Sequence, residues 1–253
     1  MYDTQNSSEY GTNENPPIIA IYTSHHKDGL EQQSIAYSND KGRHFEKSYL
    51  NPVIKNPGIS DFRDPKAFWN PVRRCWSLVL AAQDRVFFYA SQDMKNWEKT
   101  GEFGPEGNHV KGVWECPDLF EIDGQQIMTC CPQGVDQKGY DYQNVYQCGY
   151  FPVEFDLKNK SYSFGKFQEF DKGFDIYATQ TFADEAGRRI LIGWMGIPDA
   201  DYDNDATVAY DWIHALTMPR ELEWKDGKIL QHPLKEMKDL RKNAFTCELE
   251  AFT

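Results

Sequence analysis

The chain has 253 residues, a formal net charge of −12 and an aromatic content of 15%. Asp and Glu outnumber Lys and Arg by 39 to 27 without a local basic cluster, so nucleic acid is excluded as an expected partner. The longest apolar runs fall far short of the roughly 20 residues of a membrane-spanning helix, which also excludes a membrane segment of that kind.

The first 17 residues have no positively charged start and no apolar stretch, so the sequence as given predicts no signal peptide. The compartment stays unassigned, because secretion would be compatible with a start further upstream. The six cysteines are sparse, and their spacing forms no CxxC pair, so we expect buried thiols rather than a zinc site or a disulfide framework. They are Cys75, Cys116, Cys130, Cys131, Cys148 and Cys247.

Short apolar or alternating runs follow one another along the chain, and no segment keeps a helical period over several turns. These runs predict β-strands of about five to six residues. They include PPIIAIYTS (16–24), RCWSLVLAA (74–82), RVFFYAS (85–91), QQIMTC (125–130) and RRILIGWM (188–195). Turn sequences at 39–42, 122–125 and 225–228 separate strands in the same way. The sequence therefore predicts an all-β fold.

One motif recurs at a displacement of 52 to 53 residues. Ser38, Asp40, Phe45, Glu46 and Lys47 return as Ser91, Asp93, Trp97, Glu98 and Lys99, with a fainter echo at 155–164. A period near 50 residues built from short strands is typical of propeller blades, and about four such units fit the chain. A β-sandwich stays open as the alternative on the repeat alone.

Two acidic motifs stand at comparable places in successive units. FRDPKAFW (62–69) carries Arg63 and Asp64 before a proline, and VWECPDLF (113–120) carries Glu115 between Trp114 and Cys116. Burial among aromatic and thiol groups favours the protonated form of a carboxyl, as a general acid requires. In a propeller, strand starts converge on a central funnel, so both acids are expected to meet there.

A polar and aromatic set in DKGFDIYATQTF (171–182) adds to these two acids. Two carboxylates in an aromatic pocket are typical of glycoside hydrolysis, in which one acid protonates the leaving oxygen. A plain turn aspartate and a surface arginine remain the alternative for an isolated RDP tripeptide.

The segments FRDP, WECPDLF, DKGFDIYATQTF, RRILIGWM and LTMPREL (216–222) occur in this order along nearly the whole chain. Their order and spacing resemble glycoside hydrolase family 32, the β-fructofuranosidases that include invertases, levanases and inulinases. The segment from Ala20 to Lys47 is most similar to the bacterial exo-fructanases of that family. The resemblance implies an all-β, five-bladed propeller, of which about four blades are present, with residues 1–253 as one incomplete propeller domain.

Roles follow from the resemblance residue by residue. It implies that Glu115 is the acid/base, that Asp64 is the transition-state stabiliser and that Arg63 is its neighbour in the pocket. Cys116 is expected in the pocket beside the acid, and the substrate-contacting rim is expected to hold Asp171, Asp175, Tyr177 and Trp194. Because proline restricts the residue before it, we expect Asp64 to be extended at a strand entrance.

Two family motifs are missing from the sequence. The WMNDPNG-type segment with the nucleophilic aspartate and the Trp-Ser-Gly-Ser segment of the first blade are not found, and neither Asp3 nor Asp61 has the motif to replace the nucleophile. We expect blades two to five without blade one or the C-terminal β-sandwich, and little turnover by this chain alone.

Several interpretations of the missing motifs remain open. They are a truncated or split reading frame, a chain completed by a separate first-blade polypeptide, and a fructan-binding paralogue without catalysis. A fructosyltransferase or an arabinan-cleaving relative remains open within enzymes. No cofactor or metal is expected, because the histidines lack ligand spacing and the acidic loop 199–206 lacks the features of a calcium loop. Sucrose or a fructan is the expected substrate.

Overall fold

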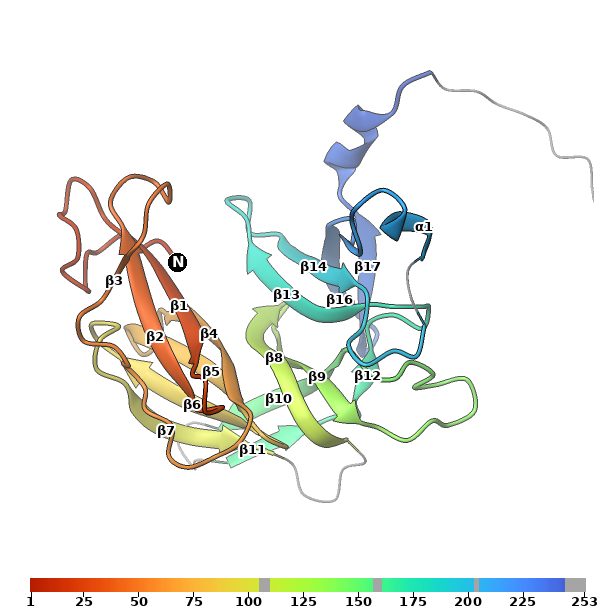
Figure 1. The fold of residues 1–253 in the computed structure, drawn as a ribbon, viewed down its shortest axis with the longest axis horizontal. Helices are drawn as coiled ribbons and strands as arrows, with labels where there is room; N and C mark the ends of the chain where they lie inside the picture. Colours follow the sequence, from red (N-terminus) through yellow and green to blue (C-terminus); the bar gives the residue numbers. More distant parts are fainter. Residues whose placement is uncertain (105–109, 157–160, 203–204, 244–253) are drawn as a thin grey trace, which may run out of the picture.

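The structure is a computed structural model that describes residues 1–104, 110–156, 161–202 and 205–243. Its strands form four antiparallel sheets, which follow one another around an arc in chain order (Figure 1). The prediction of an all-β propeller with about four blades is confirmed. No helix in the described ranges is long and apolar enough to cross a membrane.

The first two sheets come from the first 103 residues. The first contains β1 (Ile18–His25), β2 (Glu31–Ser38) and β3 (Glu46–Lys47). The second contains β4 (Phe62–Asn70), β5 (Cys75–Ala82), β6 (Val86–Ser91) and β7 (Glu98–Phe103). In each sheet the strands pair in sequence order, as expected for hairpin-connected blades.

The third and fourth sheets are built in the same way, each with one additional short strand. The third contains β8 (Lys111–Ile122), β9 (Gln125–Gly134), β10 (Gly149–Asp156), β11 (Ser161–Phe164) and β12 (Gln168–Glu169). The fourth contains β13 (Tyr177–Ala183), β14 (Arg189–Met195), β15 (Ala215–Leu216), β16 (Arg220–Lys225) and β17 (Lys228–Pro233). The described residues also form two short helical segments, α1 (Asp205–Val208) between β14 and β15 and a 3-10 helix (Lys235–Leu240) after β17.

The sequence repeat corresponds to a repeated turn in the first two sheets. Ser38 Oγ donates to Asp40 Oδ1 at 2.8 Å, and Ser91 Oγ donates to Asp93 Oδ1 at 3.0 Å. Each aspartate then accepts backbone N–H groups from the next residues of its loop. The same side-chain capping of two equivalent loops explains why these residues recur.

The strands β4, β8 and β13 each contain a bulge at the same relative place. The register shifts between Arg63 and Lys66, between Glu115 and Asp118, and between Tyr177 and Gln180. A residue with positive φ lies within each bulge: Asp64 (62°), Cys116 (50°) and Ala178 (49°). A bulge bends its strand and re-aims the adjacent side chains.

The expectation that Asp64 is extended at a strand entrance is wrong. Asp64 lies inside β4 and has left-handed backbone geometry. Its own N–H donates to Thr23 Oγ1 at 3.1 Å, and its carboxylate accepts a backbone N–H of the next sheet, so hydrogen bonds fix a conformation that aspartate tolerates better than most residues.

The core between the second and third sheets is aromatic. Trp114 and Phe103 are fully buried, and their rings lie 5.9 Å apart. Phe151 stacks on Trp114 with centroids 5.5 Å apart. The neighbouring residues Cys130 and Cys131 face two different core clusters, as alternation along a strand requires. Four thiols are buried and Cys116 is half-buried, which confirms that most cysteines lie in the interior, while Cys247 falls outside the described residues.

One polar cluster ties β4, β8 and β13 together directly after their bulges. Lys66 Nζ donates to the Thr181 carbonyl at 2.6 Å and to Gln180 Oε1 at 3.1 Å, and it lies 3.6 Å from Asp118 Oδ2. Asp118, only 2% exposed, also accepts hydrogen bonds from the hydroxyl (2.6 Å) and the backbone N–H (3.2 Å) of Thr181. The buried carboxylate of Asp118, on β8, thus contacts both Thr181 on β13 and Lys66 on β4, which links the third sheet to the fourth and the second.

We predict that Asp118→Asn lowers the free energy of unfolding by about 3 kcal/mol, because it leaves the Lys66 ammonium without its counter-charge in a mostly buried place. Urea unfolding followed by tryptophan fluorescence measures this loss. Asp226→Asn, in the exposed turn between β16 and β17, is the matched control and should change stability by less than about 0.5 kcal/mol. A loss for Asp118→Asn as small as that of the control would contradict the role given to this cluster.

Candidate functional site

The bulges of β4, β8 and β13 bring three side chains together: Arg63, Glu115 and Tyr177. Each is the last regularly paired residue before the bulge of its strand. Arg63 Nε donates to Glu115 Oε1 at 2.9 Å, and the Tyr177 hydroxyl donates to Glu115 Oε2 at 2.7 Å. The side chain of Glu115 is 16% exposed, so it is mostly shielded yet still reachable by solvent.

Glu115 is oriented by donors on both carboxylate oxygens. Gln133, on β9, donates from its amide to Oε2 at 3.0 Å, beside the Tyr177 hydroxyl. Burial, then the nearby Cys131 and Glu115, raise the pKa of Tyr177 far above its usual value, so this hydroxyl keeps its proton and remains a donor. The carboxylate is therefore held in one orientation from three sides.

Arg63 is shared among three carboxylates. Its Nη1 lies 2.7 Å from Asp61 Oδ1 and 3.2 Å from both oxygens of Glu31, while its Nη2 lies 2.8 Å from Glu115 Oε1. Burial disfavours the charged guanidinium, but the hydrogen bonds to Asp61 and Glu115 outweigh this and raise the pKa of Arg63. Arg63 therefore stays charged and fixes the position of Glu115.

Asp64 and Cys116 join the two bulges. The Cys116 backbone N–H donates to Asp64 Oδ2 at 2.9 Å, so the carboxylate is held beside the strand that carries Glu115. Burial raises the pKa of Asp64, partly offset by this hydrogen bond. Two carboxyl groups on neighbouring strands, one of them flanked by a guanidinium, can divide proton transfer and hydrogen bonding to a substrate between them.

An aromatic wall continues the site beyond Glu115. The ring of Tyr177 lies 6.0 Å from that of Tyr146 and 6.5 Å from that of Trp194, and the Trp194 ring lies 4.9 Å from His214. The Tyr146 hydroxyl donates to Asp199 Oδ2 at 2.8 Å. These rings offer apolar faces next to hydrogen-bonding groups, as a sugar ring requires.

The two other predicted rim residues are engaged elsewhere. Asp175 accepts a hydrogen bond from the Tyr202 hydroxyl, and Asp171 pairs with Arg220 Nη1 at 2.8 Å and accepts the Gly173 N–H. Neither shares a hydrogen bond with Glu115, Asp64 or Arg63 among the described residues. The structure thus brings Arg63, Asp64, Glu115, Cys116 and Tyr177 together, adds Trp194 through its ring contact, and leaves Asp171 and Asp175 outside this network.

Sequence reasoning missed three residues of the network: Glu31, Asp61 as an Arg63 partner, and Gln133. The position of Gln133 could have been predicted from the hairpin turn at Asp123-Gly124. This turn fixes the register of β9 against β8, the strand that carries Glu115. Glu31 had no local signal, since it comes from another sheet and meets Arg63 only through packing. Among described residues no group of three metal-ligating side chains is assembled, and the acidic loop 199–206 lies partly outside the described residues.

The raised pKa of Asp64 predicts a pH-dependent stability difference. At pH values above 3.8, the usual pKa of an aspartate, Asp64 loses its proton more readily in the unfolded chain than in the folded one. The contribution of Asp64 therefore lowers the free energy of unfolding as the pH rises. We expect Asp64→Asn to gain stability relative to the unmodified chain between pH 3.5 and pH 7, measured by urea unfolding at each pH. A difference that stays constant or shrinks as pH rises would contradict the burial of this carboxylate, and Asp226→Asn serves as the control.

The sequence and the fold both match known proteins. Residues 3–233 match the family model described as "Glycosyl hydrolases family 32 N-terminal domain". The chain is 38% identical to the sucrose-6-phosphate hydrolase of Staphylococcus xylosus over 241 residues, which cover 90% of this chain and 47% of that protein. It is 39% identical to the levanase of Bacillus subtilis (strain 168) over 259 aligned positions, covering 95% of this chain and 37% of that protein.

The fold is similar to the GH32 β-fructofuranosidase of Bombyx mori, with a TM-score of 0.80 and 35% sequence identity over 90% of this chain and 50% of that one. The chain therefore spans half or less of the length of these relatives. Because the family match extends over residues 3–233, and because the relatives share more than a third of the aligned residues, the chain belongs to glycosyl hydrolase family 32.

Proposed function

We propose that this protein is a glycosidase that releases terminal β-D-fructofuranosyl units from sucrose or fructans. The observation that carries the proposal is the pair of carboxyl groups of Glu115 and Asp64, which lie on adjacent bulged strands and are joined through the Cys116 N–H. Relatives named sucrose-6-phosphate hydrolase and levanase, and a Bombyx mori mutant enzyme solved with sucrose, support the substrate class.

In the proposed mechanism, a nucleophilic carboxylate bonds to the anomeric carbon of the fructosyl unit, the bond from that carbon to the glycosidic oxygen breaks, and Glu115 gives its proton to the leaving oxygen. Asp64 accepts hydrogen bonds from fructosyl hydroxyls, which stabilises the oxocarbenium-like transition state. Arg63, Tyr177 and Gln133 keep Glu115 in place during proton transfer. Glu115 then takes a proton from the water that hydrolyses the fructosyl-enzyme intermediate, so the configuration at the anomeric carbon is retained.

We propose that the nucleophile comes from outside residues 1–253, either from the same longer protein or from a separate first-blade polypeptide. A retaining enzyme needs a second carboxylate about 5 Å from the acid/base. Within the described residues Glu31 and Asp61 are engaged by Arg63, and Asp64 is engaged by the Cys116 N–H. We also propose that residues 1–253 form one incomplete propeller domain, which turns over little substrate by itself.

The charge of the aromatic wall favours a neutral leaving group. The wall beyond Glu115 holds the Asp199 carboxylate, and Asp175 lies on the neighbouring loop with Tyr202. Two basic residues of the same sheet region are neutralised, because Lys172 pairs with Asp141 and Arg220 with Asp171. A phosphate dianion on a leaving sugar placed against this wall would meet the Asp199 carboxylate, while the described basic residues Lys172 and Arg220 already have carboxylate partners. We therefore propose sucrose or a fructan as substrate in preference to a 6-phosphorylated disaccharide.

The first test uses residues 1–253 fused behind the N-terminal, nucleophile-bearing segment of a family 32 enzyme, with fructose release from sucrose, levan and inulin as readout. We expect turnover by this fusion, and a loss of about 10²- to 10⁴-fold in kcat for Glu115→Gln and for Asp64→Asn. Asp226→Asn is the control. Turnover that survives Glu115→Gln would overturn the assignment of the acid/base.

Two further outcomes of the same assay separate the other interpretations. Fructan binding by calorimetry without any fructose release would favour a binding protein, and transfer products detected by chromatography would favour a fructosyltransferase.

The second test compares sucrose with sucrose 6-phosphate on the same fusion protein. We expect kcat/KM to favour sucrose by about tenfold, because the charged phosphate would be repelled by the wall. Asp199→Asn should narrow this preference, whereas Asp226→Asn should not. Equal or faster hydrolysis of the phosphorylated sugar would refute the proposed preference while leaving the proposed glycosidase activity intact.

A further inference from the structure

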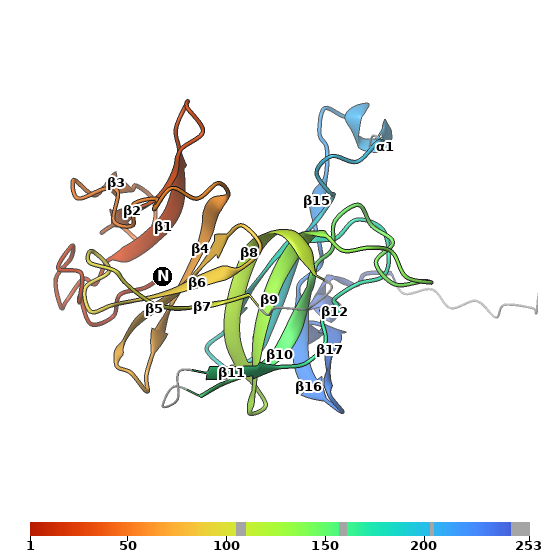
Figure 2. The same cartoon turned by 90° about the horizontal axis from the view of Figure 1, so that it is seen from below.

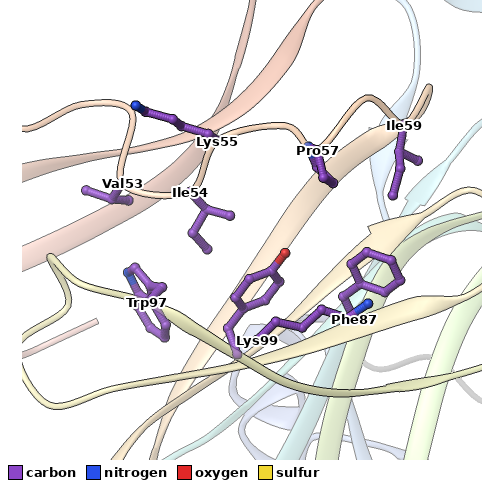
Figure 3. Close-up of a pocket in the computed structure, with 9 residues that line it drawn as sticks. Val53, Ile54, Lys55, Pro57, Ile59, Phe87, Trp97 and Lys99 are labelled. Carbon is purple, nitrogen blue, oxygen red and sulfur yellow. The ribbon is translucent and has the colours of Figure 1, made fainter.

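Two buried thiols face each other in the third sheet. Cys131 lies on β9 and Cys148 lies directly before β10, and these two strands run side by side (Figure 2). The two Sγ atoms are 3.5 Å apart, and the residues are 0% and 4% exposed, respectively. The pair is separate from the apolar hollow of about 500 Å³ beside β6, whose lining contains no cysteine (Figure 3).

The backbone pairing places these two cysteines directly opposite each other. The residues that flank them are paired across the two strands, Gly149 with Cys130 and Gln147, through its N–H, with the Pro132 carbonyl at 3.0 Å. Hydrogen-bonded and non-hydrogen-bonded pairs alternate in an antiparallel sheet, so Cys131 and Cys148 form a non-hydrogen-bonded pair, whose Cα atoms are typically about 4.5 Å apart. A disulfide requires a Cα separation of roughly 4.4 to 6.8 Å. The backbone is therefore already placed for a disulfide, and only the two sulfur atoms need to approach each other.

The two thiols differ in their hydrogen bonds. Cys148 Sγ accepts a hydrogen bond from the Cys131 thiol and lies 2.9 Å from Thr179 Oγ1 on β13. Burial disfavours a thiolate at Cys148, but these hydrogen bonds outweigh burial and lower the pKa of Cys148. Burial raises the pKa of Cys131 well above its usual value, so Cys131 keeps its proton. Because the thiolate is the nucleophile in thiol oxidation, Cys148 is the sulfur that reacts first.

A small oxidant can approach this pair from the side of the Glu115 strand. Cys116, next to Glu115 on β8, is half-buried and packs against the cluster that contains Cys131 and Cys148. Hydrogen peroxide is little larger than a water molecule, so it needs less room than a disulfide reagent. The oxidant for which this place is suited is therefore a peroxide.

We propose that Cys131 and Cys148 are a modification site, at which hydrogen peroxide forms a reversible disulfide. The Cys148 thiolate attacks one oxygen of the peroxide, the O–O bond breaks, and a sulfenic acid and hydroxide result. The Cys131 thiol then attacks the sulfenic sulfur, and the S–S bond forms as the hydroxyl group leaves with the Cys131 proton as water. In sum, the two thiols lose two electrons and two protons, and the peroxide is reduced to two molecules of water.

The disulfide would close the loop between β9 and β10 at its base. The two cysteines are 17 positions apart in the chain, and the loop between them carries Tyr146 of the aromatic wall. The Cys131 carbonyl also accepts the Tyr177 hydroxyl at 3.1 Å, the same hydroxyl that donates to Glu115. Since closing a loop restricts the unfolded chain, we expect oxidation to stabilise the fold next to the Glu115 network.

The test treats the 253-residue chain with hydrogen peroxide, alkylates the remaining thiols and maps the peptides by mass spectrometry. We expect Cys148 to be linked to Cys131, with the loss of two hydrogen atoms. Oxidation should raise the melting temperature by about 5 °C, and dithiothreitol should reverse both changes. Cys131→Ala and Cys148→Ala should each abolish the linkage. Cys130→Ala, at the adjacent buried thiol that faces a different core cluster, is the matched control and should retain it.

A linkage of Cys148 to Cys130 or to Cys116 would overturn the proposal, as would sulfinic acid without a linkage or thiols that stay unmodified. Mapping of the unsubstituted chain decides this even where an alanine variant unfolds, because fragmentation between Cys130 and Cys131 assigns the linked sulfur. An unchanged melting temperature of the linked chain would contradict the stabilising effect. None of these results depends on fructose release, so the glycosidase proposal is tested separately.

Discussion

In β4, β8 and β13 one non-glycine residue adopts positive φ within the strand, and the position of the site depends on this constraint. Asp64, Cys116 and Ala178 occupy the three equivalent places, and a residue such as Ala178 gives up about 1 to 2 kcal/mol of backbone energy there. In return, each bulge turns the residue before it toward the same point. Without the bulges, Arg63, Glu115 and Tyr177 would follow the regular alternation of their strands.

The bulges separate two polar layers that serve different ends. On one side lie Arg63, Glu115 and Tyr177, where Arg63 Nε and the Tyr177 hydroxyl both donate to the Glu115 carboxylate. On the other side Lys66 and Asp118 join the same three strands through buried hydrogen bonds. The Lys66–Asp118 layer holds the three strands at fixed distances, and at these distances Arg63 and Tyr177 can orient the Glu115 carboxylate. Residues that stabilise the fold and residues that form the site are therefore neighbours in the same sequence motifs.

The sequence predicted those parts of the fold that depend on residues close together in the chain, such as turns and capped loops. The Asp-Gly turns at 122–125 and 225–228 do join hairpins, and the repeated Ser-Asp loops do recur in neighbouring sheets. The motifs also placed Arg63 and Glu115 in one site. The bulge at Asp64 was not predictable in the same way, because a proline after it favours an extended residue and only the hydrogen bonds of a neighbouring sheet reverse that preference. Glu31 and the Lys66–Asp118 contact depend on packing between residues far apart in the chain, which no single segment encodes.

We propose that residues 1–253 hold an oriented acid and a stabilising carboxylate and need a nucleophile from elsewhere. Fructose released from sucrose by the 253-residue chain alone, compared with the chain supplied with a family 32 first-blade segment, tests this most directly. We expect release only when the segment is supplied, with retention of the anomeric configuration and with loss of release in Glu115→Gln. Comparable release by the chain alone would contradict the proposal, because the nucleophile would then lie among residues 1–253.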